Sequence, residues 1–485
     1  MLDIEYDCNT YYPLLESAYH PSVLYPEYPW NSNEISFAKN DVYNMLRNIF
    51  IRQQMDKDNL GTKKWNPLGE YIRPGQTVLL KPNWVSHKNK LVHSDDSLIC
   101  LVTHPSLVRV IVDYVVIALK GKGKIILGDA PMQGTDLDKL LELSGYNQLF
   151  SFFKKKNITI DICDFRKYKC VYKNGIISGL NLTDSFYKST LVSLGKKSVH
   201  SENDKKDFLY KVSDYDYHLT QKYHSSGVHT YEVNEAVLLA DVLINIPKPK
   251  THRLAGITGA MKNIVGIAYE KASLPHRALG DRETGKGDAY YKKNIFKMYM
   301  EHFDNKQTIY STNGSWIYAK FFDILKKAFY IGGALLSGDK YRIGSWYGND
   351  TIWRTVIDLD YIVNYADQKG VICDEPQRRI LNIGDMIVCG EKEGPIGPSP
   401  KYLGMIMISE DMFLFDYTLS RIMGFNPYKI PSLAYILKNH KDLVESIVLS
   451  NDPNISNKVV SNLIFPEEMK FEPHSCWKGH IENTF

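Results

Sequence analysis

The chain has 485 residues, of which 44% are hydrophobic and 24% are charged, and its formal net charge is +4. This composition excludes global disorder, and the length excludes one ordinary small domain, so we expect two or three domains or one large α/β body. The small net charge also argues against nucleic acid as a partner, because any basic function must then be local.

The cysteines and the absence of long apolar runs predict a cytoplasmic protein. Seven cysteines are scattered along the chain without a CxxC spacing, which predicts a reducing compartment and no iron–sulfur or zinc centre. The start, MLDIEYDCNTYYP, has no apolar segment typical of a signal peptide. No run of 18 uncharged apolar residues occurs, so we expect no transmembrane helix.

The first 72 residues are rich in Tyr, Pro and Asn and predict an N-terminal extension that packs on the body. One amphipathic helix is expected from Asn40 or Asp41, either of which can cap it. A short apolar run then begins at Thr77 and stops at Pro82, which predicts a strand.

A βαβ unit follows from this strand. Residues 103–123 predict a largely buried helix with Thr103 as a possible cap and Gly121 at its end. Residues 124–131 (KIILGDAP) predict the second strand, and residues 136–146 a second helix. Strand, helix and strand at this spacing indicate a parallel sheet with right-handed crossovers.

Later segments repeat this alternation. A strand is expected over residues 235–247, a helix near residues 259–272, two strands around a Gly/Pro loop in 386–409, and a helix over 412–424. We therefore predict an α/β protein with an open, mainly parallel sheet flanked by helices. Its core comprises residues 73–284 and 351–440, with a C-terminal tail over 441–485.

Residues 285–350 predict an inserted helical region rich in aromatic residues. Six apolar residues share one helix face there: Ile317, Phe321, Ile324, Ala328, Ile331 and Leu335. Such a stripe usually packs against its own protein. The alternative is that the insertion contacts a protein partner or a peripheral membrane surface.

Polar residues gather where the predicted strands end. In open parallel sheets, ligands bind beyond the carboxyl ends of the strands. These ends carry Lys81 and Asn83 on the first strand, Asp129 on the second, Lys248, Lys250 and His252 on the third, and Glu391 on the fourth. We expect the four segments to meet at one edge.

The segment KPKTHRLAGITGAMKNIVG (248–266) predicts an anion site. It carries uncompensated positive charge, including Arg253, and its glycines let backbone N–H groups approach a ligand. Thr258 and Gly259 stand where a helix would begin, and the free amides of a first turn attract phosphate or carboxylate. Lys262 and Asn263 lie one turn further along. A solvated loop is the structural alternative.

The expected catalytic residues are Lys262, Asp129 and Glu391. A lysine close to other cations can lose its proton and act as base or nucleophile. Neither GxxxxGK[ST] nor GxGxxG occurs, so there is no fingerprint of a P-loop or of NAD binding. Residues 276–288 combine both signs of charge with glycines, as a loop that closes over substrate would.

The sequence leaves open whether the protein binds a metal ion. His224, His229, His252 and His276 lack a strict ligand spacing, so scattered surface histidines are the simpler interpretation and no metal ligand is assigned. A divalent cation such as Mg²⁺ beside Asp129 or Glu391 is the alternative, and the HSDDS turn could contribute Asp95 and Asp96. Asp129 could instead cap the helix that follows it.

Several motifs together resemble domain of unknown function family 362 over most of residues 75–435. They are LLKPN, THPSLVRVIVDYV, ILGDAPMQGTDLDKLLELSGY, ADVLINIPKPKTHRLAGITGAMKNIVG and EKEGPIGPSPKYLG…IMGFNPYKIP. The resemblance implies an α/β fold and a bacterial or archaeal cytoplasmic protein. It also implies that Asp416 is kept where family members read AVDAVAARLMGF. Some relatives carry ferredoxin-type cysteine clusters, which this chain lacks.

Two functions fit the sequence. The first is an enzyme that acts on a small phosphorylated or carboxylated metabolite, possibly sugar-derived, by proton abstraction, epimerisation or group transfer. The second is a non-catalytic module that binds an anion or a lipid head group and docks on a membrane or an assembly partner through residues 285–346.

Overall fold

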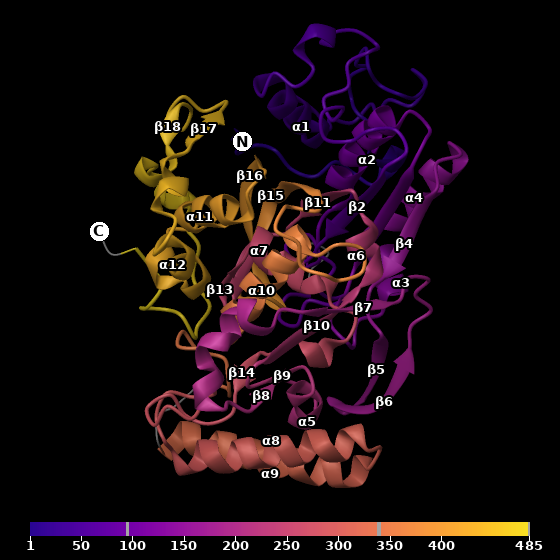
Figure 1. The fold of residues 1–485 in the computed structure, drawn as a ribbon. Helices are drawn as coiled ribbons and strands as arrows, with labels where there is room; N and C mark the ends of the chain where they lie inside the picture. Colours follow the sequence, from indigo (N-terminus) through magenta and orange to yellow (C-terminus); the bar gives the residue numbers. More distant parts are fainter. Residues whose placement is uncertain (94–96, 337–340, 484–485) are drawn as a thin grey trace.

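A large mixed sheet runs through the molecule (Figure 1). The structure is a computed structural model that describes residues 1–93, 97–336 and 341–483. The strands follow one another across the sheet in the order β18 (Lys458–Val459), β17 (Ile447–Ser450), β1 (Leu2–Tyr6), β16 (Gly397–Ser409), β15 (Arg379–Glu393), β11 (Val242–Ile246), β2 (Thr77–Pro82), β3 (Lys124–Asp129) and β4 (Ile160–Asp164).

The centre of this sheet is parallel. Strands β15, β11, β2, β3 and β4 all run in one direction, with Val242 opposite Val78 and Thr77 opposite Lys124. Strand β16 returns antiparallel to β15, and β1 pairs antiparallel with β16. The short strands β12 (Lys250–His252) and β13 (Gly256–Thr258) extend the sheet beside β15. The predicted α/β class with a mainly parallel sheet is confirmed.

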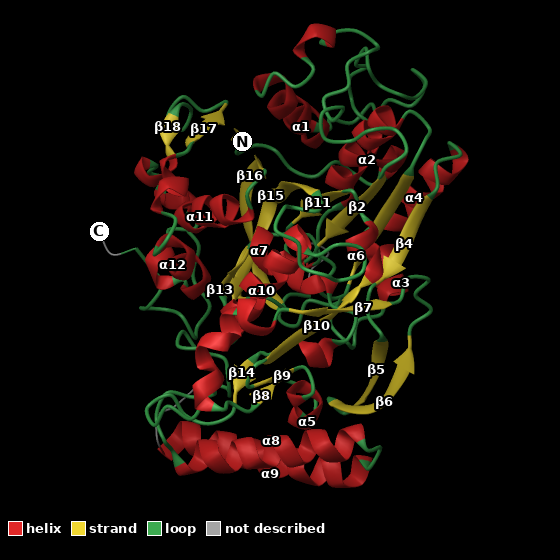
Figure 2. Cartoon of the chain, in the orientation of Figure 1, coloured by secondary structure: helices red, strands yellow, loops and turns green. Residues whose placement is uncertain are grey.

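Helices cover both faces of the sheet (Figure 2). The helices are α1 (Asp41–Arg52), α2 (Pro105–Leu119), α3 (Leu137–Leu143), α4 (Tyr146–Lys155), α5 (Tyr217–Gln221), α6 (Glu235–Leu239), α7 (Ala260–Asn263), α8 (Ile295–Thr312), α9 (Trp316–Leu336), α10 (Ile352–Tyr365), α11 (Met412–Ile422) and α12 (Pro431–Leu437). Val78 and Leu80 pack with α1, α2 and α4, whereas Leu79 packs with α10 and α11. Strands buried on both faces are typical of a parallel sheet.

Smaller sheets surround this body. They are β5 (Tyr168–Lys173) with β6 (Ile176–Leu182), β7 (Ser189–Ser193) with β10 (Val228–Asn234) and β9 (His224–Ser225), and β8 (Tyr210–Lys211) with β14 (Arg277–Ala278). At the edge of the main sheet away from β4, the start of the chain pairs with its C-terminal part, because β1 lies between β16 and β17.

Three local expectations need correction. His104, not Thr103, caps α2, and the Thr103 hydroxyl instead accepts from Asn83 N and donates to Ile246 O, both at 2.8 Å. Residues 235–239 form the short helix α6 and not the start of a strand. The helix expected over 259–272 is only the four residues of α7, followed by 3-10 turns. Other predicted strands and helices, including α1, β2, β3 and α11, are present.

The apolar stripe on α9 is exposed, contrary to the expectation that it packs against its own protein. Ile317 is 76% exposed and Leu335 79% exposed. Helix α9 instead contacts α8 through Phe322 and Phe329, and the two helices form a hairpin at one end of the molecule (Figure 1). None of the helices in the described residues is long and apolar enough to cross a bilayer.

Candidate functional site

A cavity of about 210 Å³ opens beyond the carboxyl ends of β2, β3 and β11. Its walls come from the segments that follow these strands, from residues 212–215 and from the turn between β15 and β16. The chain leaves β2 through α2 on one face of the sheet and reaches β15 through α10 on the other. The cavity therefore lies at a topological switch point, where open α/β sheets bind ligands.

Eight of the twelve residues expected at the site line this cavity: Asn83, Asp129, Lys250, His252, Arg253, Thr258, Lys262 and Asn263. Lys81 lies behind Asp129 and contacts it. Lys248, Gly259 and Glu391 are not part of the lining.

Lys81 and Asp129 form a buried ion pair at the base of the cavity. Lys81 Nζ lies 2.8 Å from Asp129 Oδ1, and the carboxylate also accepts from Trp84 N at 2.6 Å and Ala130 N at 2.8 Å. Burial lowers the pKa of Lys81, and Asp129 opposes that effect. Asp129 caps no helix, since Asp136 caps α3, and its oxygens are already engaged by the protein.

Gly266 allows the chain to cross directly over this pair. A Cβ at position 266 would lie 2.0 Å from Asp129 Oδ1 and 2.8 Å from Lys81 Nζ. The Gly266 carbonyl accepts from Ala130 N at 2.8 Å, so the close approach is also a hydrogen-bonded contact. Only glycine fits there without moving the pair.

Lys250 is a buried amine that contacts neutral oxygens. Its Nζ donates to Asn83 Oδ1 at 2.7 Å and to the Leu101 carbonyl at 2.5 Å. Burial and the nearby Lys248 lower the pKa of Lys250 to about 7. A neutral amine has two N–H groups and one lone pair, so these two acceptors leave one position on the nitrogen.

A row of asparagines fixes the orientation of the Asn83 amide. Asn83 donates to Asn263 at 2.7 Å, Asn263 to Asn245 at 2.7 Å, and Asn245 to Asn382 at 2.9 Å. Asn382 ends the row by donating to the Ser409 carbonyl at 2.9 Å. The four amides all point the same way, and they join β2, α7, β11 and β15.

Two further cations in the lining have no acceptor. Neither the Lys262 amine nor the Arg253 guanidinium makes a hydrogen bond or ion pair with any residue that the structure describes. Burial lowers the pKa of Lys262 to about 8, and Lys81 adds to this effect. Burial also lowers the pKa of Arg253.

Lys271 joins these cations and was not singled out in the sequence. Its Nζ donates to the Ala130 carbonyl at 2.8 Å, and burial lowers its pKa to about 7. Gln133 and Tyr215 were also missed; they bond to each other, and the buried Gln133 Oε1 has no hydrogen-bond partner among the described residues. Lys271 follows Glu270 directly in the sequence, and two neighbouring residues of opposite charge give no local signal of a cavity lysine.

His252 and His276 are neutral in opposite tautomers. His252 Nδ1 accepts from Leu254 N at 3.1 Å and Ala255 N at 3.0 Å, so the proton of the neutral ring lies on Nε2. His276 Nδ1 donates to the Leu274 carbonyl at 2.7 Å, which leaves Nε2 with a lone pair. Burial holds the pKa of His252 well below its usual value and lowers that of His276 to about 3, so both rings are neutral.

The remaining expected residues have other partners. Lys248 Nζ lies 3.0 Å from Asp385 and also contacts the Tyr12 hydroxyl. Glu391 accepts from Glu472 N at 2.9 Å. Gly259 lies against Asp416, whose carboxylate accepts from Ala260 N at 2.5 Å and Met261 N at 3.2 Å. The amides expected to attract an anion at the start of α7 are therefore occupied by the protein's own carboxylate.

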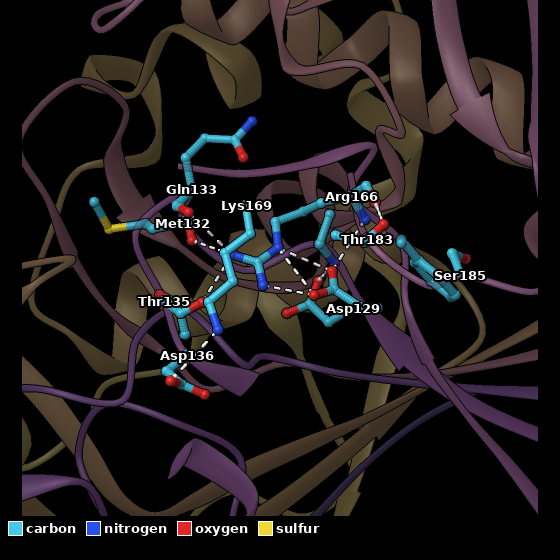
Figure 3. Close-up of polar contacts among 12 residues, drawn as sticks. Asp129, Met132, Gln133, Thr135, Asp136, Arg166, Lys169, Thr183 and Ser185 are labelled. Atoms are coloured by element: carbon cyan, nitrogen blue, oxygen red, sulfur yellow. Dashed lines mark hydrogen bonds and ion pairs between the residues drawn. The ribbon is translucent and has the colours of Figure 1, made fainter. Parts of the chain in front are cut away.

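Arg166 holds the loop that follows β3 (Figure 3). Its guanidinium donates to the carbonyls of Met132 at 2.7 Å and Thr135 at 3.0 Å, and it is anchored by Asp164. Because this buried cation joins the loop after β3 to the end of β4, it positions the wall of the cavity that contains Met132 and Gln133.

His224 and His229, the other two histidines considered as metal ligands, are buried and do not lie on the surface. His224 Nδ1 lies 3.3 Å from His229 Nδ1, and His229 Nε2 lies 2.9 Å from Asp204. Within residues 1–93, 97–336 and 341–483, no group of three or more His, Cys, Asp or Glu side chains is arranged to hold a metal ion. Asp95 and Asp96 lie outside the described residues.

Comparisons with known proteins give a family but no activity. No curated protein matches the chain. One similar solved structure is the crystal structure of a protein from Thermotoga maritima, with 10% identity, a TM-score of 0.24 and coverage of 72% of this chain and 54% of that chain. The chain thus spans about half of that protein, and a score this low carries no structural assignment.

The family comparison covers most of the α/β body. The sequence model described as "Domain of unknown function (DUF362)" matches residues 78–204 and 205–421, which together exceed half of the chain. These ranges include every residue in the cavity lining. The chain belongs to the DUF362 family.

Proposed function

We propose that this protein is an enzyme that binds a small anionic metabolite in the cavity at the switch point and transfers a proton to or from it. The observation that carries the proposal is the pair of unpartnered cations, Arg253 and Lys262, in a cavity that also contains Lys250 and Lys271. A lining with this excess of positive charge is most stable with an anion bound.

Arg253 and Lys262 are the groups that would hold the anion. A hydrogen bond to a charged group contributes about 1.5–3 kcal/mol, so two of them suffice for a weak but specific site. The Nε2–H group of His252 and the unpartnered hydroxyl of Thr258 add neutral donors beside them. A phosphate or a carboxylate offers the oxygens that these groups need.

Lys250 is the group that would move the proton. Its pKa of about 7 means that the amine is half deprotonated at neutral pH, and its two hydrogen bonds leave the lone pair as its remaining polar position. His276 Nε2 offers a second lone pair in the same cavity. In this proposal Lys250 takes the proton-transfer role that the sequence suggested for Lys262, and Lys262 takes the anion-binding role. Asp129 positions Lys81, and Glu391 has no role.

Ligand binding is tested by thermal shift with inorganic phosphate, sugar phosphates and small carboxylates. We expect wild type and the exposed-lysine control Lys122→Met to be stabilised by the same ligands. Lys262→Met and Arg253→Met should lose most of that stabilisation, because each removes one charged contact. Equal shifts in all four proteins would refute the site.

Proton transfer is tested separately by NMR of the stabilising ligands in D₂O. We expect exchange of a carbon-bound hydrogen next to the anionic group, with a rate that rises as pH increases through about 7 and Lys250 loses its proton. Lys250→Met should abolish the exchange. Binding without exchange would favour the non-catalytic module.

A reducing, cytoplasmic location remains part of the proposal, supported by seven free thiols.

A further inference from the structure

The hairpin of α8 and α9 presents an apolar face that the remaining described residues leave exposed. Helix α9 packs on α8 through Phe322 and Phe329, and Lys326 reaches Asp304 of α8 at 3.2 Å. The stripe on the other side of α9 follows spacings of four and three residues along five turns. Its large members are exposed as follows: Ile317 76%, Phe321 55%, Ile324 56%, Ile331 57% and Leu335 79%.

Helix α8 and the ends of α9 add further exposed apolar side chains to the hairpin. Ile295 is 62% exposed and Tyr299 47% exposed, and Tyr318 and Leu336 of α9 are also exposed. Large exposed apolar surfaces on a soluble body mark sites of contact with other molecules. The residues concerned belong to two packed helices, so the surface is preformed.

The acidic and the basic residues of the hairpin differ in their exposure to solvent. The acidic residues of 285–336 are Asp288, Glu301, Asp304 and Asp323, and all four are buried. The exposed charged residues of the same segment are Lys286, Lys292, Lys293, Lys306 and Lys327. The exposed charged side chains of residues 285–336 are therefore all lysines, of which Lys327 lies 2.7 Å from Asp323.

The hairpin is firmly attached to the body. Asp304 contacts Lys211 Nζ at 2.8 Å and Arg277 at 2.7 Å, and burial of the carboxylate is outweighed by these cations, which lower its pKa. Lys211 and Arg277 pair in the two-stranded sheet of β8 and β14. Binding at the hairpin would thus hold the whole protein, and not a loose appendage.

We propose that the outer face of the α8–α9 hairpin docks the protein on an anionic lipid surface, lying in the plane of the interface. Apolar side chains flanked by lysines are the pattern of an interfacial helix, since the side chains enter the acyl region while the lysines meet anionic head groups. A second copy of the chain fits less well, because self-association would bring lysines against lysines without an exposed acid in the segment to pair them.

The test is co-sedimentation of the full chain with vesicles of phosphatidylcholine alone or with about one third phosphatidylglycerol. We expect binding to the anionic vesicles that weakens with salt. Lys292→Gln with Lys293→Gln should weaken it about 30-fold, since each lysine near such a surface contributes about a factor of five. Phe321→Ser with Ile324→Ser should weaken it at least about tenfold.

Phe37→Ser is the matched control, because Phe37 is fully exposed on the N-terminal segment and should not affect vesicle binding. Equal thermal midpoints of all variants would show that folding is unaffected. Absence of anionic-vesicle binding, or equal binding by wild type and Phe321→Ser with Ile324→Ser, would overturn the proposal. A concentration-dependent dimer that these substitutions dissociate, without vesicle binding, would assign the surface to a second copy instead.

Discussion

Four lysines meet near a single buried carboxylate in this cavity. Lys81 alone forms an ion pair with Asp129, while Lys250 and Lys271 donate to neutral oxygens and Lys262 has no acceptor among the described residues. Withdrawing an amine from water costs free energy unless a countercharge replaces the water. The buried positive charge of these lysines therefore destabilises the folded protein, and a bound anion would offset that cost.

Lys250 should leave a signature in the pH dependence of stability. Its pKa in the folded protein is about 7, below the usual 10.5, so the unfolded chain binds the extra proton between these values. Stability should therefore rise with pH from about 7 to about 10, by up to about 1.4 kcal/mol per pH unit from this group. In Lys250→Met that part of the slope should disappear in urea unfolding at several pH values, whatever the change in absolute stability. An unchanged slope would contradict the assignment.

Gly266 should tolerate no side chain. In Gly266→Ala the new methyl group would meet both members of the Lys81–Asp129 pair, so we expect a loss of about 1–3 kcal/mol in the free energy of unfolding. Gly179→Ala is the control, since its nearest contact would be Val171 Cβ at 4.0 Å. The measurement is chemical denaturation of both variants; equal stabilities would show that the pair yields easily.

At the scale of elements, α7 depends on a residue far along the chain. Its first amides are satisfied by Asp416 of α11, and the helix ends after one turn. Burial raises the pKa of Asp416 to about 7, against its usual 3.8. The carboxyl group is thus a structural cap whose protonation is linked to folding.

Asp416 should make stability fall as pH rises. The folded protein retains the proton up to about pH 7 and the unfolded chain only to about 4, so the stabilisation is complete below about pH 4 and is lost by about pH 7. Asp416→Asn should remove this dependence relative to wild type. Asp416→Ala should cost about 1–3 kcal/mol more than Asp416→Asn, because the amides of Ala260 and Met261 lose their acceptor. Parallel wild-type and Asn curves in urea unfolding against pH would contradict this account.

Local patterns predicted elements well and contacts between elements poorly. The strand at Val78 to Leu80 and the cap at Asn40 follow from apolar runs and side-chain chemistry within a few residues. Lys248 and Lys250 look equivalent in sequence, yet the partner of Lys248 is Asp385 and that of Lys250 is Asn83. Such partners are set by the pairing of strands, which no local window contains.

The sequence also failed to predict that the stripe of α9 is exposed, and the cause is again the lack of information on contacts between elements. Periodicity identified the face, because a helical spacing is local, but it could not tell what covers that face. Likewise, the anion was expected at the start of α7, where Asp416 already lies. Arg253 and Lys262 of this segment line the cavity, whereas the amides at the start of α7 are bound by Asp416.

At the scale of the whole molecule, the C-terminal segment supports the site from behind. Trp477, in the C-terminal segment, is 1% exposed and donates through Nε1 to the Arg253 carbonyl at 3.0 Å. Its ring also lies beside Gly256, where a Cβ would be 3.3 Å away. The segment that carries Arg253 into the cavity is thus held from outside the matched family region.

Trp477→Ala should impair ligand binding beyond its effect on stability. We expect a loss of about 3–5 kcal/mol in unfolding free energy and a smaller thermal shift with inorganic phosphate, because the loop with Arg253 loses its support. Trp65→Ala is the control, since Trp65 is also fully buried and donates to a backbone carbonyl, Met55 O at 2.8 Å, on another part of the body. It should cost similar stability and keep the phosphate response. Equal loss of that response would assign it to general destabilisation.

The asparagine row has a mechanical consequence. The Lys250 amine donates at one end of the row and, when charged, cannot accept, while the Ser409 carbonyl at the other end can only accept, so the two ends impose one polarity on every amide between them. Turning a single amide over would set oxygen against oxygen on one side and N–H against N–H on the other. The four side chains are consequently held in one orientation together, and a displacement of Asn382 affects, through Asn245 and Asn263, the Asn83 oxygen that accepts from Lys250.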